Sequence, residues 1–156
     1  MRIETNRCLI RYFESKDIDD FITYRNNEKW MQYQGFKGLT KQEYNKALLG
    51  ETDMQSGIQL AIINKVSERL VGDIYLKQEE NTFWLGYTIN PANARQGYAY
   101  EAVSGIIGWL KENDVDKVLA DTMPENAASI SLLKKLGFSS LGTDENGDLL
   151  FSLDLK

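Results

Sequence analysis

A change of hydrophobic period in the middle of the chain constrains the fold more than any other feature. Three apolar runs of strand length follow one another at residues 58–63, 70–76 and 83–89, separated only by short polar turns. Strands this close in sequence pair as antiparallel neighbours, because a parallel pair needs a crossover of about a dozen residues or more. After Pro91 the apolar residues recur at helical spacing, at Ala99, Ala102, Val103, Ile106 and Leu110. The sequence therefore predicts an antiparallel meander followed by an amphipathic helix.

The segment before the meander is predicted to hold a strand and two helices. Residues 7–13 favour an opening strand, and Ser15 favours the start of a short helix that ends near Asn26. Thr40 and Glu43 have the spacing of a capping box, in which each side chain binds the other's backbone N–H, and this predicts a second helix.

The C-terminal third is predicted to hold a strand, a helix and a hairpin. Residues 117–122 favour a strand, Asn126 is a favoured N-cap, and Gly137 suits the end of the helix that follows. The Asn-Gly pair at 146–147 is a strong signal for a hairpin turn. This order of elements predicts an α/β fold with a mixed sheet and helices on both faces. No linker or repeat divides the chain, so we expect a single domain over residues 1–156.

Absent residue types exclude several kinds of chemistry. The chain has no histidine, which excludes Ser-His-Asp triads, Cys-His dyads and zinc sites that need an imidazole. Cys8 is the single cysteine, so it cannot form an internal disulfide, and without a histidine partner it is a poor nucleophile. One free thiol fits a reducing compartment. We therefore expect a cytoplasmic protein.

The charge and hydropathy of the chain disfavour a membrane and nucleic acid as binding partners. The longest aliphatic run, residues 60–63, is far shorter than the ~20 residues needed to span a bilayer, so no membrane partner is expected. The formal net charge is −5 and the basic side chains are dispersed, which disfavours nucleic acid. A mildly acidic surface favours the approach of cationic molecules such as amines or basic peptides.

The segment 93–102, which joins the last strand of the meander to the long helix, is suited to bind phosphate. Gly97 lets the backbone approach a ligand closely, and the first N–H groups of a helix are free to bind an anion. The segment lacks both the lysine-serine pair of a P-loop and a G-x-G-x-x-G pattern, which disfavours nucleotide hydrolysis and dinucleotide binding. The alternative is an ordinary strand-to-helix turn that needs one glycine.

Three segments, in this order, resemble the GCN5-related N-acetyltransferase (GNAT) family, and within it the branch of ribosomal-protein N-terminal acetyltransferases. They are Leu85–Pro91, then Gly97-Tyr98-Ala99 with Glu101-Ala102, then Pro124–Ser129 with Leu136-Gly137-Phe138. The resemblance is firm from about Leu60 to Phe138. It implies a mostly antiparallel central sheet that is splayed at its middle, and acetyl-CoA as cofactor with CoA as product and no metal.

The resemblance also assigns a set of cofactor-binding residues. The pyrophosphate would bind backbone amides of the turn, and the pantetheine arm would pair with the splayed end of the last meander strand. The residues implied are Tyr87, Thr88, Ile89, Arg95, Gln96, Gly97, Tyr98, Ala99, Tyr100, Asn126 and Ser129. The chain departs from the family pattern at Ala94, where Gln or Arg is usual. From the residues alone, Tyr87 could equally be a core aromatic and Asn126 a simple helix cap.

The general acid and the general base depart from the usual pattern of the family. Where many relatives have a tyrosine that protonates the departing thiolate, this chain has Leu133, so the resemblance points to Ser129 as the acid. Relatives also place a glutamate base on the strand at 83–89, which here has no carboxylate. Asp73 is a candidate base if it faces the cleft, although an aspartate on a strand usually faces solvent. Glu101 lies in the first helical turn, where the helix dipole stabilises a carboxylate, and we expect it to have this structural role.

The expected activity is transfer of an acetyl group to a primary amine by direct attack in a ternary complex. The preferred acceptor is a protein or peptide N-terminal α-amine, and the alternative is a small amine such as a polyamine or an aminoglycoside. A CoA-binding module without catalysis is a third possibility. Trp30, Tyr33 and Phe36, in the aromatic connection between the first two helices, are candidates for acceptor binding or for core packing.

Overall fold

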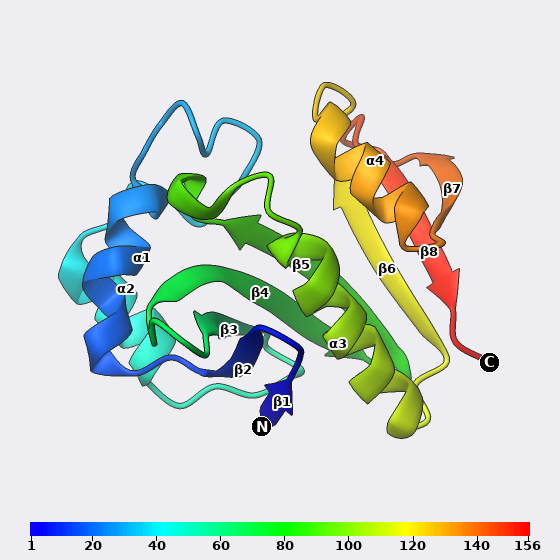
Figure 1. Cartoon of the computed structure of the whole chain (residues 1–156). Helices are drawn as coiled ribbons and strands as arrows, with labels where there is room; N and C mark the ends of the chain where they lie inside the picture. Colours follow the sequence, from blue (N-terminus) through cyan, green and yellow to red (C-terminus); the bar gives the residue numbers. More distant parts are fainter.

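The computed structural model describes every residue from 1 to 156 (Figure 1). Its strands are β1 Arg2–Glu4, β2 Cys8–Tyr12, β3 Ile58–Asn64, β4 Leu70–Glu79, β5 Thr82–Ile89, β6 Lys117–Thr122, β7 Ser139–Thr143 and β8 Leu149–Asp154. Its α-helices are α1 Ile18–Arg25, α2 Lys41–Leu49, α3 Tyr98–Glu112 and α4 Ala127–Lys135. Short 3-10 turns precede α1 at Ser15–Asp17 and α3 at Pro91–Asn93. None of these helices is both long and apolar enough to cross a bilayer.

All eight strands form one sheet in the order β1-β2-β3-β4-β5-β6-β8-β7. Every neighbouring pair is antiparallel except β5 and β6, which are parallel. The meander and the C-terminal hairpin are confirmed. Two details differ from the sequence prediction: β1 adds a short strand at the edge, and Ser15 begins a 3-10 turn capped by Glu14, so that α1 itself starts at Ile18.

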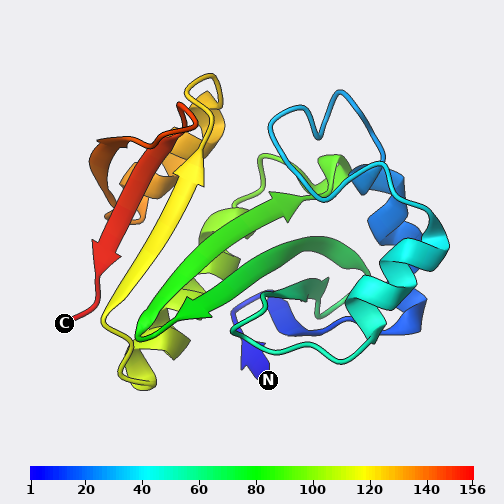
Figure 2. The same cartoon turned by 180° about the vertical axis from the view of Figure 1, so that it is seen from behind.

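The sheet is splayed at its middle, as predicted. β5 pairs with β6 only at residues 82–84, and beyond this point the two strands diverge into the V seen in Figures 1 and 2. On the other side of β5, Asn90 donates its N–H to Val71 at the end of the ladder with β4. Because N–H and C=O groups alternate in direction along a strand, those of Tyr87 and Ile89 point toward the open side of the V. The splay therefore leaves a free strand edge in the middle of the protein.

Helices cover both faces of the sheet. α3 and α4 lie on one face, and α1 and α2 lie on the other over the N-terminal half (Figures 1 and 2). Leu60 and Ile62 join the core beneath α3, whereas Ala61 and Ile63 join a second core beneath α1 and α2. Burial on both faces explains why β3 is a continuous apolar run and not an alternating one.

Glu101 ties the N-terminus of α3 to the turn between β1 and β2. Its Oε1 accepts from Arg7 Nε at 2.6 Å, and its Oε2 accepts from Thr5 Oγ1 at 2.5 Å and from the Arg7 backbone N–H at 2.7 Å. Burial acts to raise the pKa of Glu101, but the hydrogen bonds from Thr5 and Arg7 outweigh it, and the pKa is lowered. The ionised carboxylate is therefore the form that the fold stabilises.

Replacing Glu101 with glutamine should lower the free energy of unfolding at pH 7 by about 1.5–3 kcal/mol, as for hydrogen bonds to a charged group. A carboxylate with a lowered folded-state pKa stabilises the fold fully above its unfolded pKa of about 4.3, and loses this effect as pH falls through the folded value. Urea unfolding at pH 7 and at pH 3–4 should show the gap between wild type and Glu101→Gln closing in acid. The exposed Glu112→Gln, at the other end of α3, is the control. A gap that does not depend on pH would contradict the prediction.

Candidate active site

Two pockets meet at the splay. The first, which we call the sheet pocket, measures about 590 Å³ and lies over β4 and β5, with Tyr75 and Gly86 among the residues that line it. The second, the helix pocket, measures about 530 Å³ and is bordered by Ile89, by Ala99 at the start of α3, and by α4. Five residues line both pockets: Tyr33, Gln34, Tyr87, Thr88 and Ser129. The two pockets therefore adjoin at these five residues.

The turn before α3 presents a row of free amides. Gly97 caps the helix in the left-handed region at φ 81°, and Arg95 is also left-handed at φ 62°. None of the six backbone N–H groups from Arg95 to Tyr100 has a hydrogen-bond partner within the chain. Unpaired amides and the positive end of the α3 dipole together suit a phosphate group. The predicted set Arg95, Gln96, Gly97, Tyr98, Ala99 and Tyr100 is therefore contiguous and available through its backbone.

The side chains of this turn have other partners. Tyr98 is buried, its hydroxyl accepts from Asn64 Nδ2 at 2.9 Å, and the Arg7 guanidinium lies 4.1 Å from the centre of its ring. Tyr100 is 39% exposed and has Lys135 Nζ 4.5 Å from its ring centre. Only the backbone of Tyr98 is thus free for a ligand, whereas the Tyr100 ring is open to one.

Tyr87 and the first turn of α4 face each other across the splay. Asn126 caps α4, since its Oδ1 accepts from the Ser129 N–H at 3.2 Å. The hydroxyl of Tyr87 lies 2.8 Å from Ser129 Oγ, and burial raises the pKa of this tyrosine. Leu133, one turn further along α4, is fully buried in the core. The structure thus brings Tyr87, Asn126 and Ser129 together, and the cap that the sequence allowed for Asn126 is present.

A buried ionic network lies behind the sheet pocket. Asp73 on β4 is fully buried, and its carboxylate accepts from Arg25 Nη2 at 2.5 Å and from the hydroxyl of Tyr24. Arg25 Nη2 also donates to Thr88 Oγ1 at 3.2 Å, and Nη1 donates to the carbonyl of Gly35 at 3.1 Å. Burial raises the pKa of Asp73, although Arg25 and Tyr24 oppose the shift. Asp73 borders the pocket, but both of its oxygens are engaged, which disfavours a role as base.

Sequence reasoning missed Tyr24 and Arg25. Both lie at the end of α1 and both are almost completely buried. A signal was present, because Ile18, Phe21 and Arg25 are spaced at i, i+3 and i+7 and so share the inward face of the helix. A charged residue on that face predicts a buried partner of opposite charge, because an unpaired buried charge is strongly destabilising.

The aromatic connection between α1 and α2 contacts the free edge of β5. Trp30 Nε1 donates to the Ile89 carbonyl at 2.8 Å, and Gln34 Nε2 donates to the Tyr87 carbonyl at 3.5 Å. Trp30 lines the helix pocket and Tyr33 lines both pockets. Phe36 lines the sheet pocket, but its ring also packs against those of Phe21 and Tyr44. Trp30 and Tyr33 are therefore placed for ligand contact, and Phe36 is shared between pocket and core.

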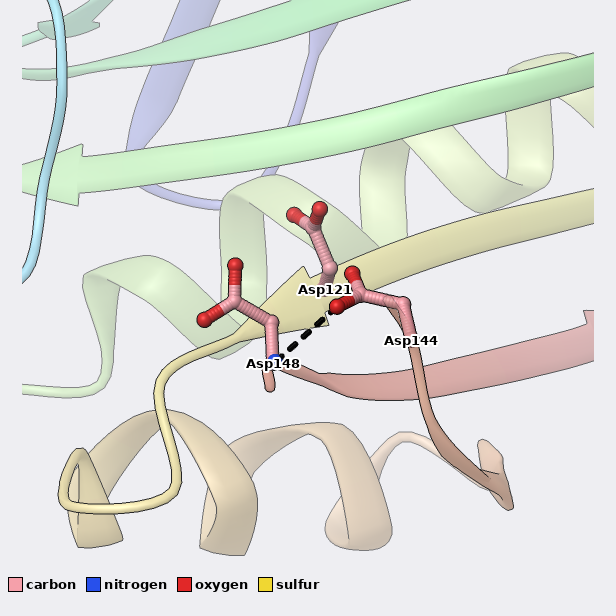
Figure 3. A group of neighbouring side chains, drawn as sticks. All are labelled: Asp121, Asp144 and Asp148. Carbon is pink, nitrogen blue, oxygen red and sulfur yellow. Dashed lines mark hydrogen bonds between the residues drawn. The ribbon is translucent and has the colours of Figure 1, made fainter. Parts of the chain in front are cut away.

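One wall of the sheet pocket is acidic. Carboxylate oxygens of Asp121, Asp144 and Asp148 lie within 4.8 Å of one another (Figure 3). Asp144 Oδ1 accepts from the Asn146 and Asp148 N–H groups at 2.9 and 3.0 Å, so it shapes the hairpin turn. Burial and the charges of Asp148 and Asp144 raise the pKa of Asp121. Asp121 and Asp148 line the pocket with Glu79. Three aspartates at this spacing are geometrically compatible with a cation, and a metal-free site stays a prediction.

The pattern described as "Acetyltransferase (GNAT) domain" matches residues 7–139. The uncharacterized N-acetyltransferase YnaD of Bacillus subtilis (strain 168) is 31% identical over 145 residues, which cover 91% of this chain and 85% of YnaD.

Solved structures share the fold. An acetyltransferase of the GNAT family from Bacillus anthracis superposes with a TM-score of 0.84 at 23% identity, covering 99% of both chains. A ribosomal-protein-S5-alanine acetyltransferase from Vibrio fischeri superposes with a TM-score of 0.82 at 18% identity, covering 100% of this chain and 97% of the other.

Proposed function

Because the chain belongs to the GNAT family of N-acetyltransferases, which use acetyl-CoA, we propose that its acceptor is the N-terminal α-amine of a protein or peptide. The observation that carries an amine acceptor is the acidic lining of the sheet pocket, which shares a wall with the helix pocket at the splay. Acetyl-CoA in the helix pocket and an amine in the sheet pocket would meet there. This arrangement supports direct transfer in a ternary complex, with no covalent enzyme intermediate.

The free amides and the open strand edge support one path for the cofactor. The diphosphate would lie on the unpaired N–H groups of residues 95–100 and the pantetheine arm along Tyr87, Thr88 and Ile89. Trp30 and Gln34 hold the carbonyls of Ile89 and Tyr87, while the N–H groups of these two residues have no ladder partner. A backbone N–H aimed at the thioester oxygen would stabilise the oxyanion without reorganisation. Asn126 and Ser129 would border the thioester, with Ser129 as the acid.

The lining of the sheet pocket supports a cationic acceptor. Glu79, Asp121 and Asp148 line it, and Lys77 is the one lining cation whose charge is not paired with Asp73. A polypeptide amine arrives as an ammonium ion and is attracted by such a wall. We assign Tyr33 and Phe36, which line the sheet pocket, to acceptor binding. Trp30 lines only the helix pocket, so we assign it to the cofactor side and not to the acceptor. The same acidic wall favours a second candidate, a small polyamine with several positive charges.

Turnover with defined amines tests the proposed function. Purified protein is mixed with acetyl-CoA and with N-terminal peptides, polyamines or aminoglycosides, and the release of free thiol is followed. We expect the fastest release with N-terminal peptides. Release with polyamines alone would replace the proposed acceptor with the small amine.

CoA should raise the melting temperature of the protein without added Mg²⁺, because the proposed phosphate site consists of backbone amides. A ligand present at about 100 times its Kd stabilises by about 2.7 kcal/mol. ATP and NAD, which lack the pantetheine arm, should have little effect. Gly97→Val should weaken CoA binding at least tenfold, since a β-branched residue is strained at φ 81° and blocks close approach.

Gly108→Ala is the matched control, because it changes a glycine in the same helix with no atom within 4 Å of the added methyl group. It should leave the CoA shift unchanged. A CoA response that disappears with EDTA would contradict metal-free binding.

A further inference from the structure

We propose that Tyr87 is a positioning residue for proton delivery: its phenol donates a hydrogen bond to Ser129 Oγ and leaves the serine proton free for the departing thiolate of CoA. This inference rests on the proposed function. It gives a residue of β5 a supporting part in the acid step that Ser129 performs.

The geometry places both hydroxyls where the reaction would occur. Tyr87 and Ser129 each line both pockets, and their oxygens are 2.8 Å apart. The Tyr87 side chain bridges from β5 to the first turn of α4, across the open side of the splay. The Ser129 backbone is held by the cap from Asn126. The cap therefore holds the backbone of Ser129, and the phenol holds its hydroxyl.

Either hydroxyl can donate across the 2.8 Å contact, and we take the phenol as the donor because a phenol O–H is more acidic than a serine O–H. Within reach of the Tyr87 hydroxyl are Ser129 Oγ at 2.8 Å and the Ser129 carbonyl at 3.4 Å, and the shorter contact is the stronger one. A phenol that donates to Oγ leaves the single serine proton without an assigned acceptor. Burial raises the pKa of Tyr87, so the phenol keeps its proton across the neutral range. A donated hydrogen bond also polarises the serine O–H and strengthens it as a donor.

The amine nitrogen bonds to the thioester carbon, and collapse of the tetrahedral intermediate breaks the carbon–sulfur bond. The sulfur takes the proton of Ser129, and the proton that the nitrogen loses returns to the serine oxygen through solvent. Tyr87 keeps its own proton throughout and acts only through Ser129. Thr88, which also lines both pockets, has its oxygen bound by Arg25.

A double-mutant cycle tests the coupling. Initial rates of thiol release at saturating acetyl-CoA and peptide are compared for wild type, Tyr87→Phe, Ser129→Ala and the double variant, together with KM for acetyl-CoA and the melting temperature. We expect Tyr87→Phe to lower kcat about fivefold to tenfold, the effect of one lost hydrogen bond. KM should stay within twofold. In the Ser129→Ala background the same change should alter kcat by less than twofold, because the phenol acts through the serine.

Further variants separate this role from a purely structural one. Ser129→Thr keeps a hydroxyl and should keep the sensitivity to Tyr87→Phe, whereas Tyr12→Phe on the exposed side of β2 should have no effect. Multiplicative losses in the double variant, or a rise in KM with kcat preserved, would overturn the inference. If Tyr87→Phe does not fold, an unchanged kcat in Ser129→Ala is sufficient to overturn it. A wild-type protein that acetylates no amine contradicts the proposed function instead.

Discussion

Replacing Asp73 with asparagine should lower the free energy of unfolding by about 3–5 kcal/mol, the cost of leaving one member of a buried ion pair without its partner. Asp73 is fully buried and Arg25 is 4% exposed, with 2.5 Å between Oδ1 and Nη2. The asparagine would leave the guanidinium charge in the interior without a counter-charge. Urea unfolding followed by circular dichroism measures the loss. Asp20→Asn, which breaks the exposed pair with Arg69, should cost only about 0–1 kcal/mol.

A second variant separates charge from packing. Arg25→Met combined with Asp73→Leu removes both charges and should recover part of the lost stability, because paired buried charges are often replaceable by apolar side chains. The Asp73 variant also tests its candidacy as a base. If Asp73→Asn is as stable as wild type but has lost kcat and the acidic limb of its pH profile, Asp73 accepts the proton and the structural role is wrong.

Local patterns predicted most of the fold because its central elements are long and strongly periodic. The runs that became β3, β4 and β5, and the helical spacing of α3, needed no tertiary information. β1 was missed because three residues carry too little pattern to distinguish a strand from an irregular terminus. It forms because its register with β2 is fixed by the turn that Glu101 holds.

Some residues of the candidate site could also be predicted from local motifs, whereas others come together only through tertiary packing. Gly97, Asn126 and Ser129 lie in local motifs that the sequence displays, and the structure places them around the helix pocket or at its phosphate turn. Arg25 and Asp73 lie 48 positions apart, and only the packing of α1 onto β4 brings them together. An aspartate on a strand is expected to face solvent, and here the second core beneath α1 reverses that expectation. Whether Asp73 or Ser129 takes part in the chemistry stays a prediction.

The acceptor prediction follows from the scarcity of bases near the thioester. β5 carries no carboxylate and both oxygens of Asp73 are engaged. Only a neutral amine can attack a thioester. At a pH of about 7.4, roughly a quarter of an α-amine with a pKa of about 7.7–8.0 is neutral, against about a thousandth of a lysine amine with a pKa of about 10.4. The reactive species therefore differ by roughly two orders of magnitude. A strong positioned base contributes about 10²–10⁴-fold and could offset that gap, but the chain has no histidine to supply one.

We therefore expect a peptide α-amine to be acetylated roughly 100 times faster than a lysine side chain near neutral pH, in line with their neutral fractions. Two peptides of matched sequence provide the comparison: one has a free N-terminus and no lysine, and the other has a blocked N-terminus and one lysine. Rates at saturating acetyl-CoA are measured from about pH 6.5 to about pH 9, the range that spans the α-amine pKa. The α-amine rate should rise with pH and level off as that amine becomes neutral. Faster lysine acetylation, or a limb set by a group with a pKa well below that of the amine, would mean that the enzyme supplies a base. Glu79, Asp121 and Asp148, the carboxylates that line the sheet pocket, would then be the first to replace.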